Sequence, residues 1–192
     1  MLIDFKKDNN FLYYIHLLKK NKIIAYPTES VFGLGCNPDN EKTVMKLIKL
    51  KKRKKNKGFI LISDNYNKFI PYIDEDRLSY AKKCDLISSK HDFVTFLVPA
   101  KNTISQLITG YSDLVAIRIV HYSILKKLCY FFKKPIISTS ANISGMSAAR
   151  SKEDVLKYFG LSFPVLFGDI GKFNYPSKII NIMTGECIRD VK

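Results

Sequence analysis

Residues 135–142 read Pro-Ile-Ile-Ser-Thr-Ser-Ala-Asn, and the rest of the chain can be arranged around them. The apolar start predicts a buried strand, along which successive side chains point to opposite faces. Ser138, Ser140 and Asn142 should then project from one face. Three small hydrogen-bonding groups on one surface are typical of a site for a polar ligand. The alternative is a polar strand end that only caps the next turn.

A cluster of cations, Lys51-Lys52-Arg53, stands well before that strand, where a predicted helix ends. On a regular helix Lys51 and Arg53 would diverge by about 200°, whereas in an extended segment they would point the same way. We expect the extended segment, so that both cations face the polar strand. That arrangement suits a phosphorylated, anionic ligand. A solvated basic helix end is the alternative.

Length and composition predict one globular domain over residues 1–192, because 46% of the residues are hydrophobic. The formal charge of +15 suggests a polyanionic partner. However, Lys supplies 27 of the 32 basic residues, a bias that A+T-rich coding would also produce. Both readings stay open, since net charge informs association and not fold.

The cysteines and the N-terminus bear on the compartment. Four cysteines lie far apart, without a Cys-x-x-Cys pair or a histidine at metal-ligand spacing. The N-terminus lacks the pattern of a secretory signal, and no apolar run approaches the length of a membrane span. We therefore expect a cytoplasmic protein with reduced thiols and no membrane partner.

Helical and strand patterns alternate along the chain, without a strict βαβ rhythm. This predicts an α+β (mixed α/β) fold, with a mixed sheet covered by helices. Helices are expected at residues 9–20, after an Asn40 cap, at 76–87, at 123–132 and after a variant capping box at Ser151 to Asp154. Strands are expected at 22–26, 59–62, 93–98, 114–120 and 135–139, with short ones near 165, 179–182 and 187–188.

Three familiar catalytic sites are missing from the sequence. It contains no P-loop motif, and Gly33-x-Gly35 has Pro38 where a dinucleotide fingerprint needs its third glycine. No Gly-x-Ser-x-Gly surrounds the serines of residues 138–140. P-loop, Rossmann and serine-hydrolase chemistry are therefore not expected.

Two further segments carry groups that could bind an anion. Residues 26–36 leave a strand through a hydroxyl-rich turn, and Gly33 and Gly35 could let the backbone approach a ligand. A plain connection, in which Thr28 and Ser30 satisfy local backbone, is the alternative. Arg118 stands between apolar residues of a predicted strand. It must meet either a structural Asp or Glu or a ligand carboxylate, because a buried charge is costly unless paired.

Taken together and in order, these motifs resemble the YrdC family in its short, single-domain bacterial form. The likeness covers residues 26–39, 51–62, 115–119, 138–145 and 176–177. The family's Lys-x-Arg and later Ser-x-Asn fall on Lys51, Arg53, Ser140 and Asn142. Among the departures, Lys54 and Gly58 stand where many relatives have proline, and Ser30 stands where Thr is common.

The resemblance implies a twisted mixed sheet with a concave basic cleft. It also implies a nucleotidyltransferase that condenses L-threonine, bicarbonate and ATP to threonylcarbamoyl-AMP and pyrophosphate. The product would serve the threonylcarbamoyl modification of the adenosine 3′ of the anticodon in tRNAs reading codons that begin with A. Magnesium would accompany ATP, with protein ligands unknown. The resemblance also implies two macromolecular partners. The tRNA threonylcarbamoyl transferase complex would receive the product, and tRNA would contact the protein.

The same resemblance assigns roles to residues of this sequence. The catalytic set is Lys51, Arg53, Ser140 and Asn142. The ATP-binding set is Arg53, Lys57, Ser138, Ser140, Asn142 and Arg189. The threonine-binding set is Thr28, Ser30, Arg118 and Ser177, with Arg118 taking the carboxylate.

Two other functions compete with this reading. A non-catalytic module of the same fold would bind double-stranded RNA or tRNA with salt-sensitive affinity and would not turn over ATP. A carbamoyl transferase of the hydrogenase-maturation type would carry acylphosphatase-like and zinc-binding segments, which this sequence lacks.

Overall fold

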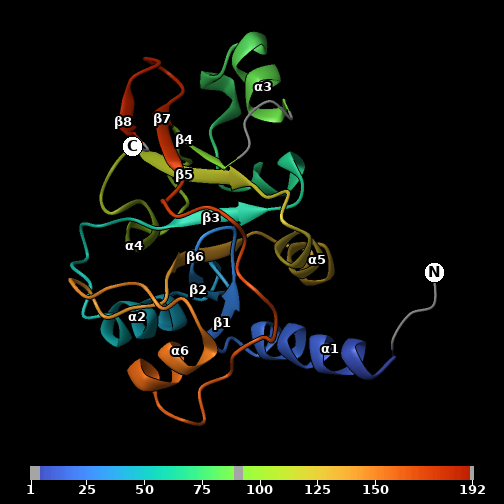
Figure 1. The fold of residues 1–192 in the computed structure, drawn as a ribbon. Helices are drawn as coiled ribbons and strands as arrows, with labels where there is room; N and C mark the ends of the chain where they lie inside the picture. The colour runs from blue at the N-terminus through green and yellow to red at the C-terminus, as the bar shows by residue number, and fades with distance from the viewer. Residues whose placement is uncertain (1–4, 89–92, 191–192) are drawn as a thin grey trace.

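A mixed sheet forms the centre of the computed structural model, which describes residues 5–88 and 93–190. In this part of the chain the sheet has eight strands in the order β1-β2-β6-β3-β5-β4-β7-β8 (Figure 1). The strands are β1 (Ile24–Pro27), β2 (Phe32–Cys36), β3 (Ile60–Ser63), β4 (Val94–Pro99), β5 (Leu114–Ile119), β6 (Ile136–Ser140), β7 (Lys178–Asn181) and β8 (Cys187–Arg189). β3 pairs parallel with β5 and β4 with β7, while the other neighbours are antiparallel. The predicted mixed sheet is confirmed.

Helices cover both faces of this sheet. The helices are α1 (Phe5–Lys19), α2 (Glu41–Leu50), α3 (Tyr80–Ile87), α4 (Gln106–Thr109), α5 (Ser123–Phe132) and α6 (Lys152–Phe159), with 3₁₀ turns η1 (Tyr66–Phe69) and η2 (Glu75–Arg77). The predicted caps are present. Asn40 accepts a hydrogen bond of 2.9 Å from the Thr43 amide, and Ser151 and Asp154 form a reciprocal capping box.

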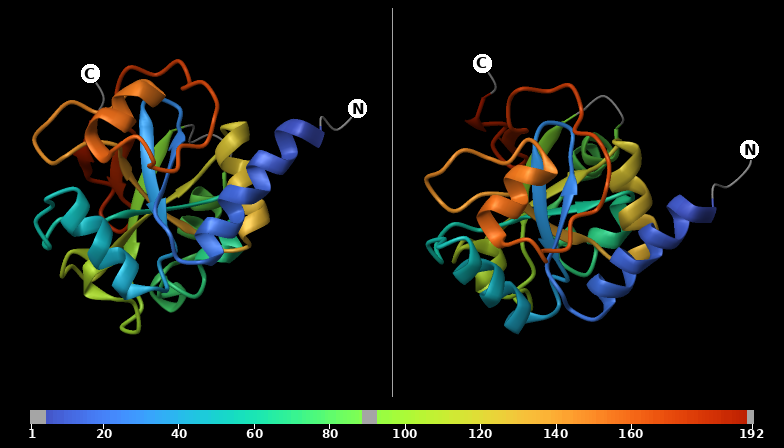
Figure 2. Two further views of the ribbon diagram at one scale, coloured as in Figure 1. Left: turned by 90° about the horizontal axis from the view of Figure 1, so that it is seen from below. Right: turned by 60° about the horizontal axis from the view of Figure 1, so that its bottom comes forward.

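The core lies in two clusters, one on each face of the sheet. Ile136 of β6 packs in the cluster that contains α1 and α5, which lie side by side in both views of Figure 2. Its neighbour Ile137 points the other way, into the cluster that contains the apolar side of α2. Since side chains alternate along a strand, Ser138 continues the face of Ile136. The strand predicted from residues 135–139 is therefore present and central.

One predicted loop is a strand. Residues 26–36 form a hairpin, in which β2 pairs antiparallel with β1 on one side and with β6 on the other. A Cβ atom at Gly35 would lie 2.5 Å from the hydroxyl oxygen of Tyr26. Gly35 thus makes room for a buried tyrosine ring, and the expectation that it approaches a ligand is wrong. Glycine inside a strand often marks such close packing, whereas Gly33 lines a cavity and its closeness to a ligand stays a prediction.

Two other boundaries differ from the prediction. The helix expected at 76–87 begins only at Tyr80, because Ser79 caps it and the residues before it form the separate turn η2. The strand expected near 165 is a single parallel bridge between Val165 and Ala25. Both segments bury apolar residues, so the hydrophobic pattern predicts which segments pack in the core but not where their elements begin and end.

The state of the cysteines and the length of the helices relate to the expectations of reduced thiols and of no membrane span. All four cysteines are free thiols, and Cys36 and Cys129 are buried in the core. Burial raises the pKa of Cys36 to about 12, so this thiol keeps its proton at neutral pH. Among the described residues, none of the helices has both the length and the apolar character needed to cross a bilayer.

Candidate active site

A cavity of about 220 Å³ opens at the end of β6. The β1–β2 turn, the start of β3, β5, the residues just before β7 and the end of β8 also contribute to its wall. Eight of the eleven site residues predicted from the sequence line it: Thr28, Ser30, Arg53, Arg118, Ser138, Ser140, Ser177 and Arg189. A larger hollow of about 770 Å³ lies at the opposite ends of β3 and β6, and none of the predicted residues lines it. The smaller cavity is therefore the candidate site.

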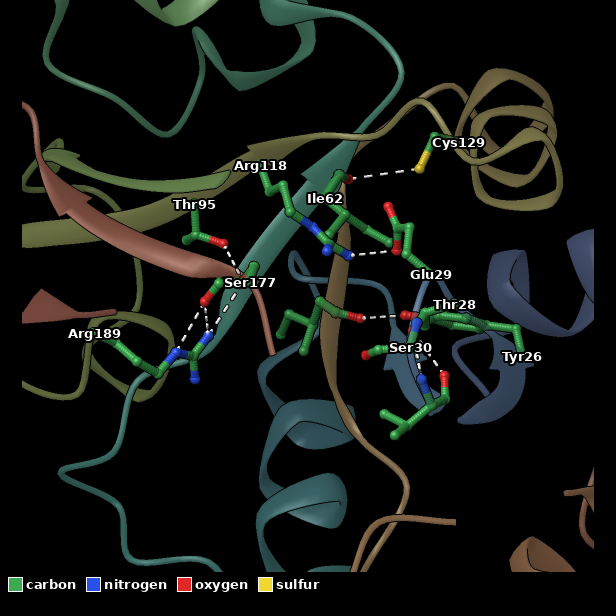
Figure 3. A network of polar contacts seen from close by, with 12 residues as sticks. Tyr26, Thr28, Glu29, Ser30, Ile62, Thr95, Arg118, Cys129, Ser177 and Arg189 are labelled. Carbon is green, nitrogen blue, oxygen red and sulfur yellow. Dashed lines mark hydrogen bonds and ion pairs between the residues drawn. The ribbon is translucent and has the colours of Figure 1, made fainter. Parts of the chain in front are cut away.

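Arg118 is a buried cation in the wall of this cavity. Its Nη2 atom lies 3.3 Å from Oε2 of Glu29, which belongs to the β1–β2 turn (Figure 3). The guanidinium carbon lies 4.9 Å from the centre of the Phe93 ring. Of the two alternatives for Arg118, the structural carboxylate is present, and the residue also faces the cavity. A ligand carboxylate would therefore meet a guanidinium that is already held in place.

Arg53 is held in a different way, by backbone carbonyl groups. Its Nε donates to the Lys57 oxygen at 3.0 Å, and its Nη2 donates to the Gly58 oxygen at 2.7 Å. The guanidinium also lies over the ring of Phe59, 4.9 Å from its centre. Burial lowers the pKa of Arg53, yet an arginine starting above 12 stays charged. A full positive charge therefore remains at the cavity wall.

The segment between Lys51 and Arg53 is not extended, so that expectation is wrong. Lys52 adopts a left-handed conformation with φ of 49°. Its amide donates to the Lys49 oxygen at 3.0 Å, and the Arg53 amide donates to the Ile48 oxygen at 2.9 Å. This is the Schellman ending of an α-helix. It turns the chain sharply, so Lys51 and Arg53 do not share one direction.

Lys51 points beneath the cavity wall and does not line it. Its Nζ donates to the carbonyl oxygens of Ser140 and Asn142, the latter at 2.8 Å, and to Oδ1 of Asn142 at 3.2 Å. The residue is only 1% exposed. Burial, with a smaller contribution from Arg53, lowers the pKa of Lys51 to about 7. The three acceptors act in the opposite sense, because they favour the ammonium form.

Asn142 shapes the loop that follows β6. Its Oδ1 accepts a bond of 2.7 Å from the Ser140 hydroxyl, and its Nδ2 donates to the Ile143 and Met146 carbonyl oxygens at 3.1 and 2.6 Å. Asn142 thus lies beside the cavity without lining it. Ser138 and Ser140 do share a face toward it, as the period of two predicts. Lys57, the third residue outside the wall, is exposed.

The β1–β2 turn presents the hydroxyl groups of Thr28 and Ser30. Thr28 Oγ1 donates to the Val31 oxygen at 2.7 Å and accepts from the Ser30 amide at 3.4 Å. Both residues are buried and line the cavity. The local backbone role that the sequence left open is therefore present for Thr28, together with a place in the wall.

Ser177 and Arg189 form one hydrogen-bonded unit in the wall of the cavity. The Ser177 hydroxyl lies 2.8 Å from Thr95 Oγ1, and Arg189 donates to the Ser177 carbonyl oxygen at 2.9 and 2.7 Å (Figure 3). Burial, together with the charge of Arg118, lowers the pKa of Arg189. Like Arg53, this cation has a neutral carbonyl partner and keeps its charge for a ligand.

The sequence reading missed two contributors, Glu29 and Phe93. Glu29 is the acidic residue within the hydroxyl-rich turn, and the carboxylate required by Arg118 was a signal that could have identified it. Phe93 has a left-handed backbone conformation with φ of 58°, and the sequence around it does not predict this conformation. The described residues contain no group of three or more His, Cys, Asp or Glu that could hold a metal ion.

Comparison with known proteins gives consistent matches over this whole region. The family model Sua5/YciO/YrdC, described as "Telomere recombination", matches residues 16–190. A threonylcarbamoyl-AMP synthase of Buchnera aphidicola subsp. Baizongia pistaciae is 51% identical over 172 residues, covering 90% of this chain and 92% of that protein. One from Photorhabdus laumondii subsp. laumondii is 44% identical, with coverage of 90% and 91%.

Solved structures share the fold. A crystal structure of P. abyssi Sua5 complexed with L-threonine matches with a TM-score of 0.82 at 22% identity, over 94% of this chain. The present chain spans 53% of that longer protein. E. coli YciO matches with a TM-score of 0.74 at 16% identity, over 97% of this chain and 92% of that chain. At these identities the likeness concerns the fold.

Proposed function

The chain belongs to the Sua5/YciO/YrdC family, and on that premise we propose that it is a threonylcarbamoyl-AMP synthase. It condenses L-threonine, bicarbonate and ATP and releases pyrophosphate. As a nucleotidyltransferase it transfers the AMP moiety of ATP to a carbamate. The observation that carries the proposal is a single cavity that joins one carboxylate-held arginine, Arg118, to two carbonyl-held ones, Arg53 and Arg189.

This cavity offers separate contacts to an amino acid and to a nucleotide. Arg118 takes the threonine carboxylate through its planar fork, and the hydroxyl groups of Thr28, Ser30 and Ser177 surround the rest of the amino acid. All four residues lie in the same wall. Their polar atoms are the kind that recognise a small molecule with carboxylate, amine and hydroxyl groups.

The nucleotide is assigned to the other part of the wall. Its phosphates meet Arg53 and Arg189, whose partners are uncharged carbonyl groups, and the hydroxyl groups of Ser138 and Ser140. Lys51 and Asn142 act from behind, because Lys51 holds the backbone oxygen of Ser140 and Asn142 accepts a hydrogen bond from its hydroxyl group. Exposed Lys57 reaches the phosphates only from the rim.

The reaction requires no protein nucleophile. Bicarbonate splits into carbon dioxide and hydroxide, and the hydroxide takes a proton from the threonine ammonium to give water. The free amine bonds to the carbon dioxide and loses a second proton to solvent, which leaves a carbamate. A carbamate oxygen then attacks the α-phosphorus of ATP, the bond to the β-phosphate oxygen breaks, and pyrophosphate leaves. Negative charge grows on the phosphate oxygens during this step, so positioned cations lower the barrier.

Magnesium is assigned to the nucleotide. The carboxylate beside the cavity, Glu29, already faces Arg118, and the described residues contain no acidic cluster for a metal. The ion would therefore enter as the Mg²⁺ complex of ATP, bound through the phosphates. Arginines suit such a site because they recognise phosphate oxygens directly.

We place the reaction in the cytoplasm, where tRNA and ATP are available. The labile product passes to a tRNA threonylcarbamoyl transferase complex, which modifies the adenosine 3′ of the anticodon. Exposed lysines at residues 52, 54, 55 and 57 lie next to Arg53, which supports a contact between this rim and the tRNA backbone.

The test is release of pyrophosphate from ATP, with threonine and bicarbonate left out in turn. We expect release only when both are present, and threonylcarbamoyl-AMP as the product in mass spectrometry. Salt-sensitive binding of structured RNA without any threonine-dependent turnover would instead support the non-catalytic RNA-binding module.

A further inference from the structure

We propose that Glu29 is a positioning residue, which orients Arg118 for the carboxylate of the amino-acid substrate; this inference rests on the proposed function. Glu29 is 9% exposed and Arg118 is 6% exposed. Their charged groups lie 3.3 Å apart. Glu29 is not among the residues that line the cavity, so it acts through Arg118.

The backbone on both sides of the Glu29 side chain is fixed. The Gly171 amide donates to the Thr28 oxygen at 2.8 Å, and the Phe173 amide donates to the Glu29 oxygen at 3.0 Å. A Cβ atom at Gly171 would come within 2.6 Å of that same oxygen. The segment of Gly171 and Phe173 therefore packs directly on the turn and fixes the backbone from which the Glu29 side chain extends.

The same segment also fixes the other side of Arg118. The Phe173 ring stacks on the Phe93 ring with centres 4.7 Å apart and planes 9° apart. Phe93 in turn lies against the Arg118 guanidinium. One edge of the guanidinium thus meets a carboxylate and one face meets an aromatic ring (Figure 3 shows the edge contact). Together these contacts set the plane in which a substrate carboxylate must approach.

The ion pair leaves bonding capacity unused. Glu29 Oε2 and Arg118 Nε have no hydrogen-bond partner in the described part of the chain, although both atoms are buried. An unsatisfied buried donor is costly, so a small shift of Arg118 that lets its Nε donate to a substrate carboxylate lowers the free energy of the site. Glu29 balances the charge of Arg118 while the site is empty, and leaves its fork available.

The test compares threonine binding and turnover in Glu29→Gln, which removes the charge and keeps the shape. We expect the threonine Kd in calorimetry and the threonine KM to rise about tenfold. We expect kcat to stay within about twofold and ATP affinity to be unchanged. Glu29→Asp keeps the charge and should recover part of the affinity. Glu153→Gln, the same change at an exposed helix position, is the matched control.

A double-mutant cycle separates this role from general support of the fold. If Glu29 acts through Arg118, then Glu29→Gln added to Arg118→Ala causes no further loss of threonine affinity. Additive losses would overturn the proposal, as would a fall in kcat at unchanged threonine KM. If Glu29→Gln does not fold, Glu29→Asp replaces it in the double-mutant cycle with Arg118→Ala. Absence of threonine-dependent turnover in the unmutated protein would count against the proposed function, whereas calorimetry of the variants tests Glu29 separately.

Discussion

The cavity has two walls that hold their cations by different means. The amino-acid wall contains Thr28, Ser30, Arg118 and Ser177, and the nucleotide wall contains Arg53, Ser138, Ser140 and Arg189. On the amino-acid side Arg118 faces the carboxylate of Glu29, whereas on the nucleotide side Arg53 and Arg189 donate to backbone carbonyl groups. A carbonyl group fixes a guanidinium without cancelling its charge. A carboxylate fixes it and neutralises it. The nucleotide wall is therefore built for attraction of negative charge, and the amino-acid wall for recognition by shape and hydrogen bonding.

The largest effect should follow loss of a carbonyl-held cation. Arg53→Ala removes a full charge where the reaction builds up negative charge, so kcat/KM for ATP should fall by a factor of hundreds, about 3 kcal/mol. Threonine affinity should change little. Pyrophosphate release and calorimetry measure the two quantities.

Lys55→Ala is the control for Arg53→Ala, because Lys55 is an exposed cation of the same loop outside the cavity wall. It should keep nearly full activity. An Arg53→Ala enzyme with normal kcat/KM would remove the nucleotide wall from the site.

The second effect concerns Lys51, a cation held by carbonyl groups but out of contact with the cavity. Its pKa falls from 10.5 to about 7 on folding. Between these values the unfolded chain binds the extra proton, so the contribution of Lys51 to the unfolding free energy should rise with pH. From about pH 7 to about pH 9 this contribution rises by about 2 kcal/mol, so the difference in unfolding free energy between the protein and Lys51→Met should change by that amount.

Urea unfolding of the protein and of Lys51→Met at several pH values measures that difference. Lys55→Met, at an exposed position, should behave as the unmutated protein does. A pH-independent difference would show that the three oxygens around Lys51 Nζ hold its proton against the effect of burial.

A smaller effect should follow replacement of Arg118, the cation held by a carboxylate, with lysine, which keeps the positive charge. Arg118→Lys loses the fork and its pairing geometry, so threonine affinity should fall about tenfold, about 1.4 kcal/mol. ATP affinity should stay within about twofold of the original. Equal weakening of both ligands in calorimetry would contradict the division into two walls.

The smallest effect is the response of the two walls to salt. Raising NaCl from about 50 to about 500 mM screens an uncompensated charge more than a paired one, so ATP affinity should fall a few-fold. Threonine affinity should hardly change, since Glu29 already balances Arg118. A matching fall for both ligands would show that the walls do not differ electrostatically.

The sequence predicted the parts of the site that depend on local pattern. The strand around Ser138 and Ser140 follows from an apolar run and a period of two, and the caps at Asn40 and Ser151 follow from residue chemistry at helix ends. Such signals act over a few residues, and all of them are present in the structure.

It failed where a distant partner decides the outcome. Gly35 could let a ligand approach the backbone until the ring of Tyr26 is placed against it. Lys51 resembles a ligand-binding cation until its bonds to Ser140, 89 residues away, are known. The sequence shows that Arg118 needs a carboxylate partner, but it does not identify Glu29 as that partner, because spacing along the chain does not reveal which residues pair in space. The pairing of Arg118 with Glu29 and the bonds of Lys51 share one cause, contacts between residues far apart along the chain, whereas the end of α2 at Lys52 and the start of α3 at Ser79 are local features that the residue pattern left ambiguous.

The order of strands in the sheet also constrains how the protein reaches its native state. Cavity residues extend from Thr28 to Arg189, and the Tyr14 hydroxyl bonds to the Val165 oxygen across 151 residues. Chains dominated by such distant pairings fold slowly, since long loops must close before any contact repays them. The cavity should therefore be among the last features to form, and ligand binding should report complete folding more faithfully than helix content does.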